Sequence, residues 1–298
     1  MTITNEIEDT KHFLDTSVAQ PMLMGPEQVK QYYKEHFGND RLYISEYVQM
    51  EFRRSVIAPL IDFYMLLDMP PIQSLGDALA TWSESFKPGA LKAVLRLIGQ
   101  IVDTHQLDGR DKEECLRVIG RIIKRIERSV GDRFVNIGEN ATRCARSRVH
   151  LVTTQTEQLP ISDQFKEFID QFNDVQSCRS RCRVDAFILS RSKAEIEAFI
   201  AHSETLEKPN HQDNKGFVGI SENLQTISDK GGDACSCRMC GRIGDAIIAL
   251  ETPINMQLEH TDRSFNHLCD LLQKPHYQHP AAITIQNSYS SSASNENS

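Results

Sequence analysis

The chain has 298 residues, of which 40% are hydrophobic and 25% charged, with a formal net charge of −8 at pH 7. This composition is sufficient for a substantial core, and the length suggests about two domains. No apolar stretch approaches the ~18 residues of a membrane-spanning helix, and the first residues lack the basic and apolar regions of a signal peptide. We therefore expect a cytoplasmic protein whose eight cysteines are thiols or metal ligands rather than disulfides.

The first 70 residues are predicted to form a short strand followed by helices. The apolar run over 12–14 ends at Asp15 and a Thr-Ser pair, which predicts a strand that terminates in a polar cluster. Helices are expected over 27–36 and over 45–67, where Ser45 is a good N-cap residue and precedes Glu51 by six positions. Asp15 is therefore expected directly after a strand, and Glu51 is expected on a helix.

The middle of the chain is predicted to be mainly helical. The β-branched, apolar stretch over 149–154 favours a strand. Residues 205–233 contain Pro, Asn, Asp and Gly with little periodicity, which indicates an exposed connection. Helices are expected over 90–104, 112–130, 164–172 and 184–202.

The helix expected over 112–130 has one basic face, while apolar residues line the others. One interpretation is a surface that contacts the phosphates of a nucleic acid and offsets an acidic active site. The other is an ordinary solvated helix face, and the sequence alone leaves both open. The basic residues are Arg117, Arg121, Lys124, Arg125 and Arg128.

Five of the eight cysteines fall into two tight clusters. Cys178 and Cys182 have the i, i+4 spacing that places both side chains on one side of a helix. A C-x-C-x-x-C motif spans 235–240, and such a knuckle together with the pair can supply the four thiolates of a structural zinc site. Coincidental clustering of thiols is the alternative. The preferred zinc ligands are Cys178, Cys182, Cys237 and Cys240, with Cys235, His202 or His211 as substitutes, and Cys115, Cys144 and Cys269 are expected in the core.

Four acidic residues have local contexts typical of metal-binding carboxylates. Besides Asp15 and Glu51, Asp245 stands at the head of an apolar stretch, and Asp262 follows a short apolar segment. Two divalent ions about 3.5–4 Å apart can neutralise a phosphate, activate a water and stabilise the leaving oxygen. Hard oxygen ligands select Mg²⁺ or Mn²⁺. The alternative is that these are caps and surface acids among the 41 Asp and Glu residues.

The segments HFLDTSV, YISEYVQMEFRR, RIGDAIIALE and HTDRSF resemble, in that order, the four acidic signatures of PIN-domain ribonucleases. The resemblance implies an α/β fold with a parallel sheet flanked by helices, and water-positioning roles for Thr16, Ser17 and Thr261. The chain departs from the pattern at Ser264, where many relatives have another acid. It also departs in the distance of 194 residues from Glu51 to Asp245, which implies a large, mainly helical insertion.

These observations predict a discontinuous PIN-like nuclease domain over 1–70 and 235–281, a helical insertion over 71–234, and a disordered tail over 282–298. The predicted function is a Mg²⁺- or Mn²⁺-dependent endoribonuclease, with RNA as substrate. Its alternative is a non-catalytic, zinc-stapled protein that binds nucleic acid or regulates. The resemblance adds two further hypotheses, a toxin-like nuclease restrained by a regulatory, antitoxin-like protein, and a homodimer.

Overall fold

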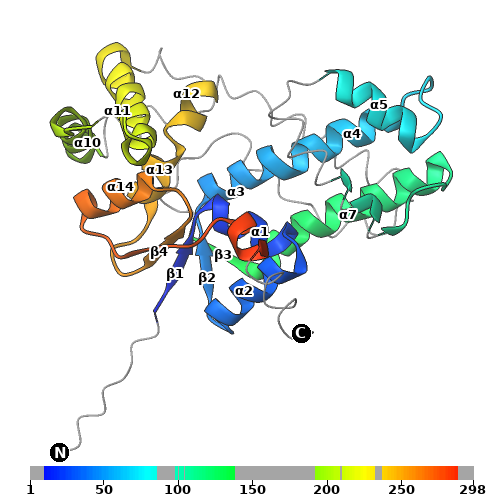
Figure 1. The fold of residues 1–298 in the computed structure, drawn as a ribbon, viewed down its shortest axis with the longest axis horizontal. Helices are drawn as coiled ribbons and strands as arrows, with labels where there is room; N and C mark the ends of the chain where they lie inside the picture. Colours follow the sequence, from blue (N-terminus) through cyan, green and yellow to red (C-terminus); the bar gives the residue numbers. More distant parts are fainter. Residues whose placement is uncertain are drawn as a thin grey trace, which may run out of the picture. The chain divides into compact units, whose positions relative to one another are not determined.

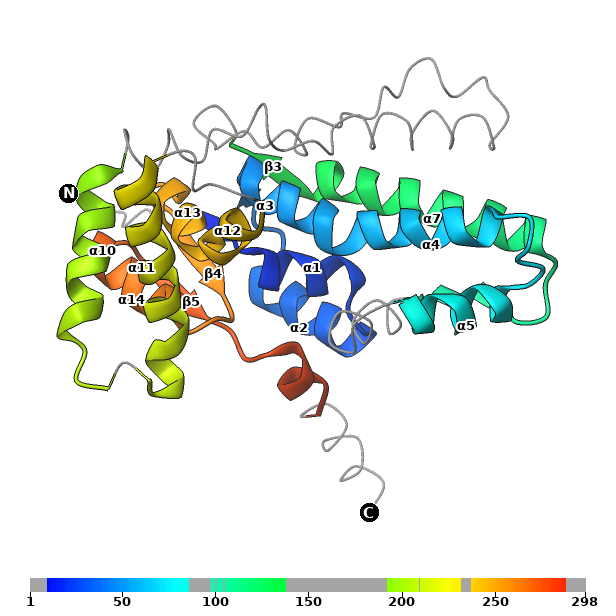
Figure 2. The ribbon, with the colours of Figure 1, turned by 90° about the horizontal axis from the view of Figure 1, so that it is seen from above.

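The computed structural model shows a mixed α/β protein (Figures 1 and 2). It describes residues 10–85, 98–99, 101–103, 105–137, 192–208, 210–231 and 237–287. The strand predicted over 149–154 and the helix predicted over 164–172 lie outside these residues. The chain divides into two compact units, which are Met1–Gln49 with Arg133–Cys144 and Arg181–Ser298, and Met50–Asp132 with Ala145–Ser180.

The first unit is built on a five-stranded sheet whose neighbouring strands are all parallel, in the order β3-β2-β1-β4-β5. The parallel sheet flanked by helices confirms the predicted fold class. A parallel sheet is normally covered on both faces, and the three residues of β1 are all buried. The strands are β1 His12–Leu14, β2 Leu42–Ile44, β3 Phe134–Asn136, β4 Gln257–His260 and β5 His276–Gln278.

Helices cover both faces of this sheet. Helices α1 (Thr16–Met24) and α2 (Glu27–Phe37) connect β1 to β2 and lie on one side. Helices α13 (Gly244–Glu251) and α14 (Ser264–Leu272) pack together on the other side (Figures 1 and 2). Within the sheet, β1 lies between β2 and β4, so the strand order reverses at β1. Open α/β sheets bind ligands at such a point, outside the carboxyl ends of the strands.

The exposed connection predicted over 205–233 is wrong, because most of this stretch forms helix α11 (Gln212–Lys230). Phe217, Ile220, Leu224 and Ile227 recur at helical spacing and are buried, a pattern that the surrounding Gly, Asn and Asp residues obscure. Helix α11 packs against α10 (Lys193–Thr205) and α14.

The disordered tail predicted over 282–298 is wrong at its start. Residues 282–287 are helical, and the N–H groups of Thr284 and Ile285 donate to the carbonyl of Ala281. Ile285 is 2% exposed, so its side chain gains enough burial to order the turn. Residues 288–298 lie outside the described part.

The two compact units do not coincide with the predicted boundaries at 70 and 235. Strand β3 lies within the stretch assigned to the insertion, yet it pairs with β2, with Leu42 opposite Phe134. Helices α10 and α11 also belong to the unit that holds the sheet. A strand of three residues is too short to produce a readable period in the sequence.

The second unit is helical in its described part. Helix α3 (Glu46–Phe52) leads from the first unit into the π-helix η1 (Arg53–Ile57), which continues as α4 (Ala58–Asp68). Helices α5 (Leu75–Ser85) and α7 (Lys112–Arg133) follow. The rings of Phe63 and Trp82 stack at a centroid distance of 4.7 Å, and Lys112 Nζ donates to the carbonyls of Met69 and Ile72, each at 2.8 Å.

A buried ion pair lies inside this unit. The guanidinium of Arg53 donates to Oε1 of Glu127, with its Nε at 2.8 Å, and both side chains are at most 5% exposed. Two charges removed from water are tolerated only while each neutralises the other.

We predict that Arg53→Leu destabilises the second unit by about 3–5 kcal/mol, because it leaves the Glu127 carboxylate buried without its cation. Urea unfolding followed by the fluorescence of Trp82 reports on this unit, because Trp82 is the only tryptophan of the chain. The control Arg125→Leu changes an exposed residue of α7 and should shift stability by no more than about 0.5 kcal/mol. Equal effects of the two changes would contradict the role given to the pair.

Candidate active site

Asp15 lies at the carboxyl end of β1, at the point where the strand order reverses. It is the N-cap of α1, and its Oδ2 accepts a hydrogen bond from the backbone N–H of Ser17 at 2.9 Å. The residue is 4% exposed. Burial raises the pKa of Asp15, hydrogen bonds from Ser17 and Thr16 lower it, and the negative charge of Asp262 raises it. Capping of α1 is by itself a sufficient reason for an aspartate at this position. A helix cap does not require a second carboxylate nearby, so the proximity of Asp262 calls for another explanation.

Ser17 connects the end of β1 to the end of β4. Its hydroxyl forms a hydrogen bond with the carboxylate of Asp15 and accepts one from the backbone N–H of Thr261 at 3.1 Å. Thr261 directly follows β4 and precedes Asp262. The strand ends that carry Asp15 and Asp262 are thereby held together by a side chain as well as by the sheet.

Asp245 and Asp262 meet at a single serine hydroxyl. Asp245 lies in the first turn of α13 and is half-buried, whereas Asp262 is exposed in the loop after β4. Ser264 Oγ donates to Oδ2 of Asp245 and lies 3.0 Å from Oδ1 of Asp262. The Ser264 backbone N–H donates to the same Asp262 oxygen at 3.0 Å. A hydroxyl has one proton and can donate to only one carboxylate at a time, so the pair has a residual need for positive charge.

Three of the four predicted acids therefore come together at the carboxyl ends of β1 and β4. They arrive from the first strand, from the loop after the fourth strand, and from the N-terminus of α13. Glu51 lies on α3, is half-exposed, and belongs to the second compact unit. Its predicted part in the site therefore remains a prediction.

A different group of residues in the described part of the chain brings potential metal ligands close together. One nitrogen each of His36 and His279 and one oxygen of Glu259 all lie within 4.8 Å of one another. The carboxylates of Asp15, Asp245 and Asp262 are not grouped this tightly. No sequence motif reveals this cluster, because its members come from α2, from β4 and from the residue after β5.

The predicted cysteine zinc site remains a prediction. Cys178, Cys182 and Cys235, and the side chain of Cys237, lie outside the described part. Cys240 is buried, with its Sγ 3.6 Å from Tyr47 Oη. Of the three cysteines expected in the core, Cys115 and Cys269 are buried as predicted, and Cys144 lies outside the described residues.

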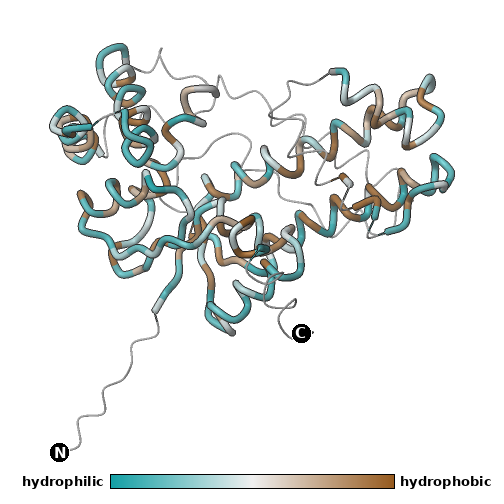
Figure 3. Tube along the Cα trace, in the orientation of Figure 1, coloured by the Kyte–Doolittle hydropathy of each residue, from teal (hydrophilic) through white to brown (hydrophobic). Residues whose placement is uncertain are grey.

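The basic face predicted on one helix is present on α7. Of the apolar residues of this helix, Leu116, Ile119, Ile123, Ile126 and Val130 are buried, whereas Ile122 is half-buried, as is Lys124. Figure 3 shows hydrophobic and hydrophilic residues interspersed along α7. A phosphate-binding surface and an ordinary solvated helix face would both show this arrangement. Binding of the basic face to nucleic acid therefore remains a prediction. The exposed members are Arg117, Arg121, Arg125 and Arg128.

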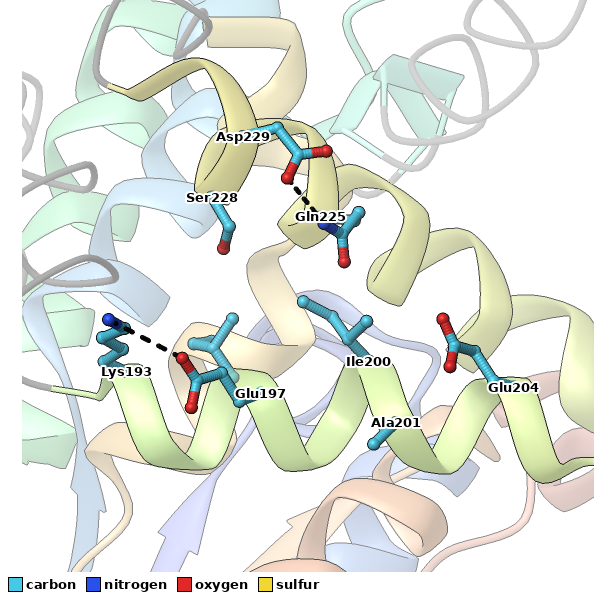
Figure 4. Close-up of a pocket in the computed structure, with 9 residues that line it drawn as sticks. Lys193, Glu197, Ile200, Ala201, Glu204, Gln225, Ser228 and Asp229 are labelled. Carbon is cyan, nitrogen blue, oxygen red and sulfur yellow. Dashed lines mark hydrogen bonds and ion pairs between the residues drawn. The ribbon is translucent and has the colours of Figure 1, made fainter.

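A groove of about 510 Å³ lies between α10 and α11 (Figure 4). Its polar lining is paired along the helices, with Lys193 Nζ 3.8 Å from Glu197 and the Gln225 amide donating to Asp229 at 2.7 Å. No predicted site residue lines this groove, and these pairs give no indication of a ligand.

Comparison with known proteins gives no match to a family model, to a curated protein or to a solved structure. Within the described ranges, no helix is both long and apolar enough to cross a membrane.

Lys274 fixes the carboxyl end of α13, the helix that carries Asp245. Its Nζ donates to the backbone carbonyls of Ala249, Leu250 and Thr252 at 2.5–2.9 Å, where the helix dipole also favours a cation. Burial lowers the pKa of Lys274 to about 8, and negative charges including Glu195 and Glu251 act in the opposite direction.

We predict that Lys274→Met changes the pH dependence of stability above pH 8. In wild type the folded pKa lies below the unfolded value of about 10.4, so the unfolded chain binds more protons in this interval and wild type gains stability as pH rises. The variant should lose this slope in urea unfolding between pH 8 and 10. Lys230→Met, at the exposed end of α11, is the control and should keep the wild-type slope, and a Lys274→Met curve parallel to wild type would contradict the assignment.

Proposed function

We propose that the chain is a Mg²⁺- or Mn²⁺-dependent nuclease that hydrolyses phosphodiester bonds in RNA, with Asp15, Asp245 and Asp262 of the first unit as its metal ligands. The observation that carries the proposal is the meeting of three carboxylates at the strand-order reversal between β1 and β4. This is the place where open parallel sheets bind their ligands.

The carboxylates suit hard divalent cations. Asp15 is buried beside the charge of Asp262, and Asp245 and Asp262 share one hydroxyl proton. Such a set repels itself unless a cation or protons neutralise it. Ions held by oxygen ligands alone would be Mg²⁺ or Mn²⁺, and they would supply charge neutralisation at the phosphate and activation of water.

The chain's own residues position these groups. The hydrogen bonds from Ser17 and Thr16 hold the Asp15 carboxylate in one orientation. Ser264 fixes the separation of Asp245 from Asp262. Lys274, by holding the carbonyl end of α13, limits the movement of the helix that presents Asp245.

The exposed arginines of α7 provide a surface for the nucleic-acid backbone. A net charge of −8 disfavours binding of a polyanion, so local positive charge is needed. In this proposal Arg117, Arg121, Arg125 and Arg128 contact phosphates without reading the base sequence. The enzyme would act in the cytoplasm, as a homodimer, and a regulatory, antitoxin-like protein would restrain it.

A non-catalytic, nucleic-acid-binding protein is the second candidate. The observation in its favour is that, in the part of the chain that the structure describes, the acids are not grouped as tightly as the residues around Glu259. Binding without cleavage would identify it.

We predict that Asp15→Asn and Asp245→Asn each lower Mn²⁺-dependent cleavage of single-stranded RNA by about 100-fold or more. Loss of an outer-shell partner of a metal already costs about 10–100-fold, and a direct ligand should cost at least as much. Cleavage is measured by gel with a labelled RNA at fixed Mn²⁺ concentration, and circular dichroism verifies the fold.

Asp229→Asn provides the matched control for this pair, because Asp229 is an exposed acid of the same unit. It should cleave at the wild-type rate. An Asp15→Asn variant that cleaves as fast as wild type would remove this residue from the site, and RNA binding without cleavage by wild type would favour the second candidate.

We predict that the triple change of Arg121, Arg125 and Arg128 to Gln weakens RNA binding without regard to base sequence. Each lost phosphate contact on a single strand should reduce the slope of log K against log salt by about 0.7. Fluorescence anisotropy at several salt concentrations measures the slope. A triple change of the exposed Lys193, Lys208 and Lys230 to Gln alters the net charge equally, and equal slopes for the two variants would show that α7 is an ordinary solvated face.

A further inference from the structure

A fully buried carboxylate lies among histidines beneath α2. Glu259, on β4, is 0% exposed. Its Oε1 lies 2.6 Å from His12 Nδ1, and its Oε2 lies 2.8 Å from His279 Nε2. The Nε2 atom of His36 is 3.9 Å from the same Oε2. One carboxylate oxygen therefore faces two imidazole nitrogens, and the other is held by a third ring.

The sheet brings these residues together from distant parts of the chain. His12 is the first residue of β1, which pairs with β4 so that Leu14 lies opposite Glu259. Since side chains alternate along a strand, His12 and Glu259 lie on the same face. His279 follows β5, whose Tyr277 lies opposite Glu259. His36 comes from α2, which covers this face.

Glu259 has no lysine or arginine partner among the described residues. Its polar contacts are to the three histidines and to the amide of Gln257, whose Nε2 donates at 3.0 Å. A buried carboxylate needs a positive charge close by. In this cluster the charge comes either from a protonated histidine or from a metal ion.

The outer atoms of the cluster are also positioned. The hydroxyl of Tyr32 lies 3.1 Å from His279 Nδ1, which fixes that ring with its Nε2 toward Glu259. The carboxylate of Asp40 lies 3.3 Å from His12 Nε2, so His12 connects two carboxylates. Metal-binding histidines usually have their second nitrogen held by a hydrogen-bond partner, as Tyr32 holds Nδ1 of His279. The buried hydroxyl of Tyr33, whose ring centroid is 5.2 Å from that of His279, has no hydrogen-bond partner in the described part.

We propose that His36, Glu259 and His279 bind a divalent first-row transition ion, with Zn²⁺ as the best match. Two imidazole nitrogens and one carboxylate oxygen form a ligand set that this class of ion favours and that Mg²⁺ does not. Bonds of about 2.1 Å in a tetrahedron place ligand atoms about 3.4 Å apart. The distances of 2.8 Å and 3.9 Å from Glu259 Oε2 to the two histidines lie on either side of this value.

The proposed ion has access to solvent through one ligand. His279 and Glu259 are fully buried, whereas the side chain of His36 is 27% exposed. Three protein ligands leave a coordination position for water or a small ligand, which is the arrangement of catalytic rather than structural zinc sites. This site is separate from the oxygen-only acids, since it lies on the face of the sheet under α2 and uses none of them.

The experiment is a titration of the full-length protein, freed of metal with chelator, with Co²⁺ as a spectroscopic substitute for Zn²⁺. A site of nitrogen and oxygen ligands gives visible d–d bands, whereas a cysteine site adds an intense thiolate charge-transfer band in the near ultraviolet. The spectrum thus separates the proposed site from the cysteine clusters. Competition with a chromophoric chelator gives the Zn²⁺ affinity.

Three variants sharpen the test. His36→Gln removes the partly exposed ligand and should abolish the d–d bands of this site while circular dichroism remains unchanged. Tyr32→Phe removes the hydroxyl that lies against His279 Nδ1 and should weaken Zn²⁺ binding about 10-fold. His105→Gln, an exposed histidine of the second unit, should bind as wild type does.

Two outcomes would overturn the proposal. One is a Co²⁺ spectrum whose d–d bands are the same in wild type and His36→Gln, and the other is equal Zn²⁺ affinity in these two proteins. In either case the histidines form a metal-free hydrogen-bonded network that neutralises Glu259. Neither result depends on nuclease activity, so the two proposals fail or stand separately.

Discussion

The parallel pairing of β1 with β4 joins residues that lie far apart in the sequence, and both candidate sites depend on it. Leu14 lies opposite Glu259, a separation of 245 residues. The pairing places Asp15 beside the Thr261-Asp262 loop at the strand ends, and it places His12 beside Glu259 on the face under α2. A shift of one residue in this register would turn Glu259 toward the opposite face. The register therefore determines which side chains can meet at either site.

Charged side chains are neutralised in different ways in three parts of the molecule. In the second unit, Arg53 and Glu127 neutralise each other, which requires no ligand. At the strand ends, the carboxylates of Asp245 and Asp262 meet at one hydroxyl, and Asp15 lies close to Asp262. Beneath α2, a carboxylate is surrounded by imidazoles, which can either carry protons or bind metal. Only the last two arrangements leave a role for a cation from solution, and their donor atoms favour different metals.

Much of the fold could be predicted because its signals are local. The helix over 112–130 has a strong 3.6-residue period and is present as α7, and the strand ending before Asp15 is present as β1. The positions of Asp15, Asp245 and Asp262 at element boundaries could be predicted, because a short segment reveals each boundary. Strand β3 could not be predicted, since its three residues acquire their structure only by pairing with β2.

The histidine cluster escaped sequence analysis for the same reason. More than two hundred residues separate His36 from Glu259, and His279 follows Glu259 by twenty positions. No spacing motif therefore connects the three residues. One signal was available, because Gln257 and Glu259 alternate with Leu258 in an apolar context and thus place two polar side chains on one face of a strand. A polar pair on a strand of a buried sheet requires polar partners from elsewhere, although the sequence does not identify them.

The two candidate sites share the strands β1 and β4. Asp262 follows Glu259 by three positions at the carboxyl end of β4. Asp15 likewise follows His12 by three positions, at the end of β1. An ion at Glu259 would bind the folded chain and not the unfolded one, so it would stabilise the pairing of β1 with β4 by mass action. That pairing is what brings Asp15 toward Asp262. Occupancy of the histidine site would therefore favour the arrangement that the acidic site requires, without the two sites sharing a ligand.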